Sequence, residues 1–193
     1  MQRSGMLCIL CGKTWMPMNQ DCIMNGNERL RRAGKLSAAD WDKMVVRAES
    51  LMAGHKFGCS ESVILTFKEM FEDYFSDAAV AMSSAFRGGM GGAGCTCGAL
   101  AAGQMVLGAF FGYYGDAGGE QNPEEVKKAR TLYNELHDRF RELNKAACCR
   151  VLTKGTEPNT PERKAKCAWL VKTAVGITGG IIARESVEPV SRE

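Results

Sequence analysis

The sequence has little of several features that identify common classes of protein. Only two of its 193 residues are histidines, His55 and His137, and no Cys-x-x-Cys-His segment occurs, so covalently attached haem is not expected. The formal charge is only +3, which gives no sign of a nucleic-acid-binding surface. The N-terminus lacks a long apolar stretch followed by a small-residue cleavage site, and we therefore expect a cytoplasmic protein.

Strand patterns are also absent, because polar and apolar residues do not alternate in runs bounded by turns, and there is no internal repeat. Apolar residues nevertheless make up 45% of the chain, enough for one substantial core. Many of them recur at steps of three and four residues, which is typical of helices with one buried face. The sequence predicts an all-α fold, a single-domain helical bundle of about five to seven helices.

We expect three parts along the chain. Residues 1–35 show no helical period and are predicted to form an irregular, cysteine-containing N-terminal extension. Residues 36–185 carry the helical patterns, with Ser37 and Asn122 placed to cap two of the helices. Residues 186–193 are predicted to be a flexible tail.

The longest apolar stretch covers residues 98–115 and is rich in glycine and alanine. Its length is close to the lower limit for crossing a bilayer. Because it contains Gln104 and has no flanking belt of positive charge, a helix enclosed by other helices is favoured over a helix in lipid. We therefore predict a central buried helix and no membrane span.

Cysteine is the abundant residue that carries chemistry. The nine cysteines are Cys8, Cys11, Cys22, Cys59, Cys95, Cys97, Cys148, Cys149 and Cys167. In a reducing compartment, so many cysteines indicate metal ligation or redox catalysis more than structural disulfides. Free cysteines are also among the most buried residues, so any one of them could be inert core.

Four of these cysteines occur in distinctive surroundings. Gly58 and Cys59 precede a predicted helix, and Cys97 follows a segment with five glycines in seven positions, residues 88–94. Cys149 is followed by an arginine, and Cys167 comes eighteen residues later on an apolar stripe. Such glycine runs suit tight turns and close approach of the backbone to a ligand.

Together these segments resemble a family of redox-active proteins with four cysteines and a Cys-Gly-Ala-x-x-Gly motif (C_GCAxxG_C_C), whose domain also occurs in split-Soret cytochromes. The resemblance covers roughly residues 40–183. The motif's last glycine is Ala102 here, with Gly103 following. The resemblance implies that the redox thiols or metal ligands are Cys59, Cys97, Cys149 and Cys167, and that the cofactor-binding residues are Gly91, Gly92, Gly94, Gly98 and Arg150.

The helical reading places Cys59, Cys97 and Cys167 in or near the first turns of helices. Free backbone N–H groups there favour the thiolate, so we expect lowered thiol pKa values, which would favour both metal binding and disulfide exchange. Cys8, Cys11 and Cys22 resemble part of a metal site but supply only three ligands.

Three functions are compatible with these residues. The first is electron transfer through an iron–sulfur or related metal centre held by the four cysteines. The second is metal-free thiol–disulfide oxidoreduction, and the third is a non-catalytic interaction module stabilised by zinc. The expected partner is a redox protein or a small-molecule electron donor or acceptor, not nucleic acid; whether the chain is an enzyme or a homodimer is left open.

Overall fold

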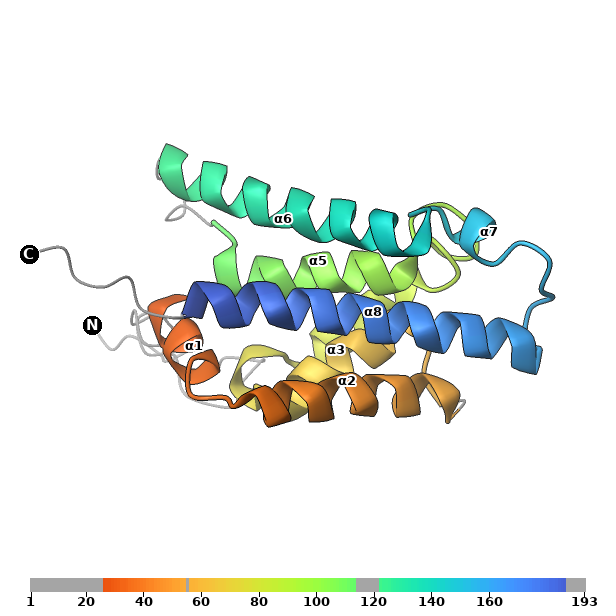
Figure 1. The fold of residues 1–193 in the computed structure, drawn as a ribbon, viewed down its shortest axis with the longest axis horizontal. Coiled ribbons are helices and arrows are strands. Elements are labelled where there is room, and N and C mark those ends of the chain that lie inside the picture. Colours follow the sequence, from red (N-terminus) through yellow and green to blue (C-terminus); the bar gives the residue numbers. More distant parts are fainter. Residues whose placement is uncertain (1–25, 55, 114–121, 187–193) are drawn as a thin grey trace, which may run out of the picture.

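The structure is a computed structural model that describes residues 26–54, 56–113 and 122–186 (Figure 1). Over these residues the only regular secondary structure is helical, apart from one isolated bridge between Thr96 and Cys148, so the all-α prediction is confirmed. The α-helices are α1 (Gly26–Ala33), α2 (Ala38–Ala53), α3 (Cys59–Met70), α4 (Asp77–Ser83), α5 (Gly98–Phe111), α6 (Pro123–Asn144), α7 (Cys149–Leu152) and α8 (Pro161–Ser186).

These eight helices exceed the expected five to seven because the short helices α1 and α7 were not predicted from the sequence. The helix α1 lies inside residues 1–35, which we expected to be irregular. Tertiary contacts account for it: the Arg29 guanidinium donates a hydrogen bond to the Ala109 carbonyl of α5, and Ala33 is buried. Contacts of this kind stabilise helices too short to form alone.

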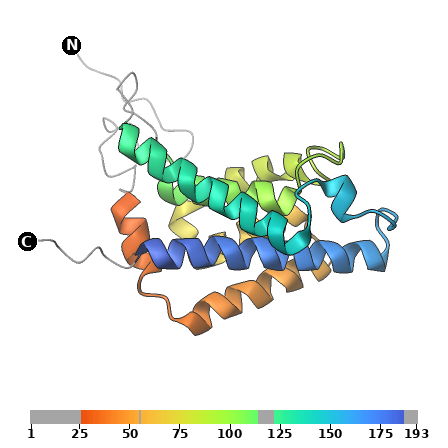
Figure 2. The same ribbon diagram turned by 45° about the horizontal axis from the view of Figure 1, so that its top comes forward.

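The long helices α2, α3, α5, α6 and α8 lie lengthwise beside one another, as Figures 1 and 2 show from two directions. The helix α8 contacts α1, α2, α3, α5 and α6, and α5 contacts α3, α6 and α8. One end of the bundle carries α1, whereas the opposite end carries α7 and the glycine-rich loop before α5. The cysteines discussed below belong to that second end.

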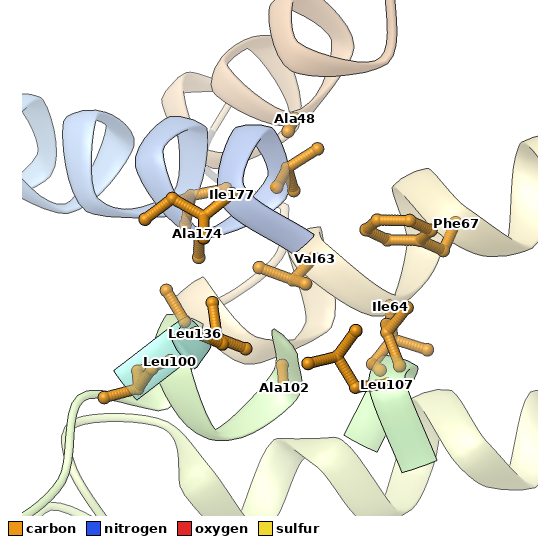
Figure 3. Packing of buried hydrophobic residues seen from close by; sticks show 14 of the residues in the cluster. Ala48, Val63, Ile64, Phe67, Leu100, Ala102, Leu107, Leu136, Ala174 and Ile177 are labelled. Carbon is orange, nitrogen blue, oxygen red and sulfur yellow. The ribbon is translucent and has the colours of Figure 1, made fainter. Parts of the chain in front are cut away.

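Side chains from four helices meet in the core (Figure 3). Val63 and Phe67 of α3, Leu107 of α5, Leu136 of α6 and Ile177 of α8 point toward one another and are almost completely buried. Each such side chain contributes about 1.5–3 kcal/mol relative to an exposed one. The core therefore joins the two sequence halves that supply the cysteines.

The predicted apolar helix is α5, which approaches its neighbours closely. A Cβ atom on Gly103 would lie 2.9 Å from the Thr178 hydroxyl of α8 and 3.1 Å from a methyl group of Leu136. Ala102, which stands at the last glycine of the motif, is fully buried. The close approach is thus made at Gly103, one residue after the motif position.

The helix starts follow the predicted capping signals. The backbone N–H of Asp40 donates to the Ser37 hydroxyl (3.3 Å), and the Asp40 carboxylate accepts from the Ser37 backbone N–H (3.1 Å), a capping box. The Asn122 side chain accepts from the Glu124 backbone N–H at 3.0 Å, with Pro123 as the first helical residue. These local contacts set where α2 and α6 begin.

One helix among the described residues, α8, is long and apolar enough to cross a bilayer by length and composition alone. In the structure, 56% of its apolar stretch is buried inside the bundle. A buried core helix passes the same test, so this finding is weak evidence for a membrane span. The predicted central helix, α5, is shorter and apolar.

Candidate redox site

The glycine-rich loop has an unusual backbone. Residues 88–92 are five successive positions with φ between +62° and +87°, and Gly94 adds a sixth at +75°. Glycine adopts such angles without steric cost, whereas other L-residues rarely do. Met90 is the exception in this run, with φ +62°. The glycines therefore allow a left-handed turn immediately before Cys95 and Cys97.

Backbone hydrogen bonds tie this loop to the segment before α7. The N–H of Cys97 donates to the Ala147 carbonyl at 2.8 Å, and the N–H of Arg150 donates to the Gly94 carbonyl at 2.9 Å. Between them, the N–H of Cys149 donates to the Cys95 carbonyl at 2.5 Å. This short antiparallel pairing fixes the start of α5 beside the start of α7.

The four predicted cysteines line one cavity of about 320 Å³ at this end of the bundle. Cys59 is the first residue of α3, Cys97 immediately precedes α5, and Cys149 is the first residue of α7. Their exposed fractions are 8%, 2% and 5%. Cys167 is partly buried and its thiol, like the other three, is free of disulfides. The structure thus brings the four residues together from four helices.

Two glycines permit the close packing around these thiols. A Cβ atom on Gly98 would lie 2.7 Å from the Cys59 sulfur and 2.5 Å from the Phe86 carbonyl oxygen. A Cβ atom on Gly89 would lie 2.6 Å from the Cys149 Cβ. All three distances are shorter than real Cβ contacts, so any side chain at either position would displace its neighbours.

Burial affects the pKa values of Cys59 and Cys97 more strongly than their positions at helix starts do. Burial raises the pKa of Cys97 to about 12, with the neighbouring Cys59 as the next cause. Burial also raises the pKa of Cys59, although the Gly88 backbone N–H partly offsets this. The expected lowering of these pKa values is therefore wrong for the metal-free site, because desolvation of the thiolate outweighs the N–H groups at the helix starts.

Cys167 differs from the expectation in a second respect. It is the seventh residue of α8 and so lies in the second turn, beyond the reach of the free N–H groups of the first turn. Burial and the nearby Cys59 raise its pKa, and Arg163 partly offsets both effects. Cys59, Cys149 and Cys167 line the same cavity, and the first two contribute to the raised pKa of Cys167.

The charged side chains of the cavity are all positive. Arg87, Arg163 and Lys164 line it, and the described residues place no carboxylate in its wall. Glu61 lies just outside, 3.5 Å from Arg87, and accepts from the Gly58 backbone N–H at 2.9 Å. The remaining lining residues are Met52, Phe57, Gly58, Gly88, Thr153, Pro158, Asn159 and Leu170. Such a wall favours a negatively charged occupant.

Arg163 also organises the segment between α7 and α8. Its guanidinium donates to the carbonyls of Thr153 (3.4 Å) and Thr156 (3.2 Å). The hydroxyl of Thr153 in turn donates to the Cys149 carbonyl at 2.6 Å. The same residue thus supports the loop and places positive charge near the thiols.

Some predicted cofactor-binding residues lie elsewhere. Gly91 and Gly92 are exposed, and a Cβ atom at Gly92 would meet nothing within 4 Å. Gly94 lies against the side chain of Arg150, which is exposed and donates to the Ala93 carbonyl at 2.8 Å. None of these four lines the cavity, whereas Gly98 abuts Cys59.

Sequence reasoning missed Gly58, Gly88, Arg87, Arg163 and Lys164 as lining residues. The positions of the first three gave a usable signal, since Gly58 adjoins Cys59, and Arg87 and Gly88 open the glycine run. Arg163 also gave a signal, because it lies four residues before Cys167 on the predicted last helix, so the two side chains share a face. Nothing in the sequence marked Lys164.

Among the described residues, Cys95, Cys148 and His137 do not line the cavity. Cys95 is exposed, and the Cys148 thiol donates to the Gly94 carbonyl at 3.1 Å. His137 is on α6 beside Asp138. His55 and the predicted partial metal site of Cys8, Cys11 and Cys22 lie outside the described residues.

The described residues contain no group of three or more histidine, cysteine, aspartate or glutamate side chains arranged to hold an ion as they stand. The four thiols nevertheless form a donor set that suits soft metals, such as zinc or the iron of iron–sulfur clusters.

A family model described as "Putative redox-active protein (C_GCAxxG_C_C)" matches residues 57–181. Comparisons with curated proteins and with solved structures gave no match. The printed name orders its central letters Gly-Cys-Ala, whereas this chain reads Cys97, Gly98, Ala99. The match extends over well over half of the chain and includes all four cavity cysteines. The chain therefore belongs to this family of redox-active proteins.

Proposed function

We propose that the cavity holds an iron–sulfur cluster ligated by Cys59, Cys97, Cys149 and Cys167, and that the protein transfers electrons through it. One observation carries the proposal. Four thiols from four helices line a single cavity whose only charged side chains, among the residues described, are cations. Thiolate-ligated clusters are negatively charged, so the nearby Arg163 and Lys164 offset part of the cost of burying them. Arg87 is paired with Glu61.

Membership of a redox-active family favours a cluster over a zinc ion. Zinc does not change its oxidation state, so a structural zinc site would not account for redox activity. The described residues form no ready group for either kind of metal centre. A structural zinc module is therefore the weaker interpretation.

The raised thiol pKa values favour a metal over metal-free exchange. Thiol–disulfide exchange needs a thiolate as the nucleophile, and burial holds Cys97 protonated with a pKa of about 12. A bound metal removes this obstacle, since its charge deprotonates the thiols that it binds. Cys59 and Cys97 are neighbours, so thiol–disulfide oxidoreduction stays the second candidate.

The chain's own residues would tune such a centre, which when bound takes up and releases one electron. The Gly88 N–H stabilises negative charge on the Cys59 sulfur. Arg163 places positive charge beside Cys167. Burial of Cys97 and Cys149 keeps water away from their sulfurs. These are the features that set the potential of a buried redox centre.

Anaerobic purification followed by iron, sulfide and zinc analysis tests the proposal. We expect iron and acid-labile sulfide with a visible absorption band that bleaches on reduction. Colourless protein without metal, but with a titratable disulfide, would replace the cluster with thiol–disulfide chemistry. Stoichiometric zinc without redox activity would support the structural module.

Substitution of single cysteines adds a matched control. Cys97→Ser should abolish the iron and sulfide content while helicity, measured by circular dichroism, is kept. Cys95→Ser removes an exposed cysteine only two residues away that does not line the cavity, and it should keep the centre. Equal loss in both variants would show that the cavity cysteines are not the specific ligands.

A further inference from the structure

Two large apolar side chains lie exposed beside the cysteine cavity. Leu143, near the end of α6, is 62% exposed, and Trp169 of α8 is 56% exposed. Both line one surface groove, here called the Trp169 groove, with Lys145, Leu152, Lys166 and Leu170. The Trp169 indole N–H donates to the Asn144 side-chain oxygen at 3.0 Å, which fixes the ring. Exposed tryptophan in a hollow is a frequent energetic centre of protein interfaces.

The groove has a basic border. Lys145 and Lys166 line it, and no carboxylate does so among the residues that the structure places there. The Lys166 ammonium donates to the Lys154 backbone carbonyl at 3.0 Å. Residues 145–166 contain six lysines and arginines but two glutamates, while the whole chain has a net charge of only +3. Positive charge is thus concentrated around the cavity and the groove.

The groove and the cavity share a wall. Leu170 lines both of them. On α8, Lys166 immediately precedes Cys167, and Trp169 follows two residues after Cys167. A protein seated on the Trp169 groove would therefore be separated from the cavity by little more than one layer of side chains.

A second groove with an exposed apolar residue offers a contrast. Val46 of α2 is 63% exposed, but its groove contains Asp42 together with Lys43 and Arg47. None of the residues lining that groove lines the cysteine cavity. Apolar exposure, uncompensated positive charge and contact with the cavity wall coincide in the Trp169 groove.

We propose that the Trp169 groove is the docking surface for a small acidic electron-carrier protein of the ferredoxin type. This inference rests on the proposed function, because it supplies that centre with its partner. One electron passes from the reduced carrier to the oxidised centre. The carrier is thereby oxidised and the centre reduced, and no covalent bond forms or breaks. Weak electron-transfer complexes bury small areas, and opposite charges around an apolar contact accelerate and orient the encounter.

Binding is tested separately from electron transfer. The probe is an oxidised acidic [2Fe–2S] ferredoxin, titrated into the purified protein by isothermal calorimetry at low and high salt. Trp169→Ala and the double variant Lys145→Glu/Lys166→Glu should each weaken binding by about tenfold or more. The matched controls Val46→Ala and Lys43→Glu should bind like the wild type. Equal affinity in all four variants, or no binding by the wild type at low salt, would overturn the docking surface.

Electron transfer then separates this proposal from the proposed function. Stopped-flow mixing measures reduction of the centre by reduced ferredoxin and, independently, by dithionite. In Trp169→Ala, we expect a slower reaction with ferredoxin and an unchanged reaction with dithionite. A protein that dithionite cannot reduce contradicts the redox centre, whereas ferredoxin rates equal to those of the wild type contradict the groove. Binding to vesicles containing phosphatidylserine in place of ferredoxin would assign the basic groove to a membrane surface and overturn the proposal.

Discussion

Gly98 lies so close to Cys59 that a Cβ atom at position 98 would stand 2.7 Å from the cysteine sulfur. The same atom would stand 2.5 Å from the Phe86 carbonyl oxygen, which cannot rotate away. The first residue of α5 therefore has to lack a side chain if α3 and α5 are to bring Cys59 and Cys97 to one cavity.

This relationship predicts the effect of Gly98→Ala. The added methyl group should destabilise the protein by about 1–3 kcal/mol, as overpacking does in tight sites, and should reduce occupancy of the redox centre. Denaturant unfolding and iron analysis measure the two effects. The control is Gly108→Ala on the same helix, where a Cβ would meet nothing within 4 Å and alanine favours the helix. A Gly98→Ala protein as stable as this control would show that the contact is not tight.

The glycine loop gives a second matched pair, Gly89→Ala and Gly91→Ala. Both residues have positive φ, +73° and +64°, so both variants should lose about 1–2 kcal/mol from backbone strain. Only Gly89→Ala adds a clash, with Cys149 Cβ at 2.6 Å and the Cys95 nitrogen at 2.8 Å. We expect a larger loss of stability and of the centre for Gly89→Ala. Equal effects would mean that glycine is needed in this loop only for its backbone conformation, and not for the close contact with Cys149.

A third prediction concerns the pH dependence of the reduced, metal-free protein. The pKa of Cys97 rises from an ordinary value of 9.0 to about 12 on burial, so above pH 9.0 the unfolded chain loses this proton while the folded protein keeps it. The stabilising contribution is thus complete below pH 9.0 and is lost as the pH rises toward about 12.

The measurement compares the free energy of unfolding of the wild type with that of Cys97→Ser as the pH is raised. The stability advantage of the wild type should fall with pH, by up to about 1.4 kcal/mol per pH unit. Cys95→Ser should run parallel to the wild type. Parallel curves for Cys97→Ser as well would show that Cys97 does not titrate abnormally.

The helices could be predicted because their signals are local. Ser37 and Asn122 make their capping contacts with residues two or three positions away, and apolar periodicity depends on neighbours within one turn. The helix α1 was not predicted because it is stabilised by contacts of Arg29 and Ala33 with helices that are distant in the sequence. Prediction from the sequence is strongest where the stabilising partner is close in the chain.

In the candidate site too, some features could be predicted from the sequence and others could not. Cys59 and Cys97 could be singled out through their adjoining glycines, and Cys149 and Cys167 through the family resemblance. The pKa values could not be predicted, because the sequence shows the helix starts of Cys59 and Cys97 but not the depth of burial that outweighs them. Arg163 was missed too, although it lies four residues before Cys167 on the same helix, a spacing that brings two side chains together.

Two arginines near the cavity end of the bundle have different surroundings. Arg163 lines the cavity and lies beside Cys167, whereas Arg150 is exposed and lines no part of it. Reduction adds negative charge to the centre, so a nearby cation favours the reduced form. Arg163→Gln should therefore lower the reduction potential, and an electrostatic loss of roughly 1 kcal/mol corresponds to about 40 mV for one electron. Arg150→Gln should leave the potential close to the wild-type value, although it loses the hydrogen bond to Ala93. Potentiometric titration measures the reduction potential of both variants. A larger shift in Arg150→Gln than in Arg163→Gln would place the redox centre on the side of the exposed loop, away from the cavity.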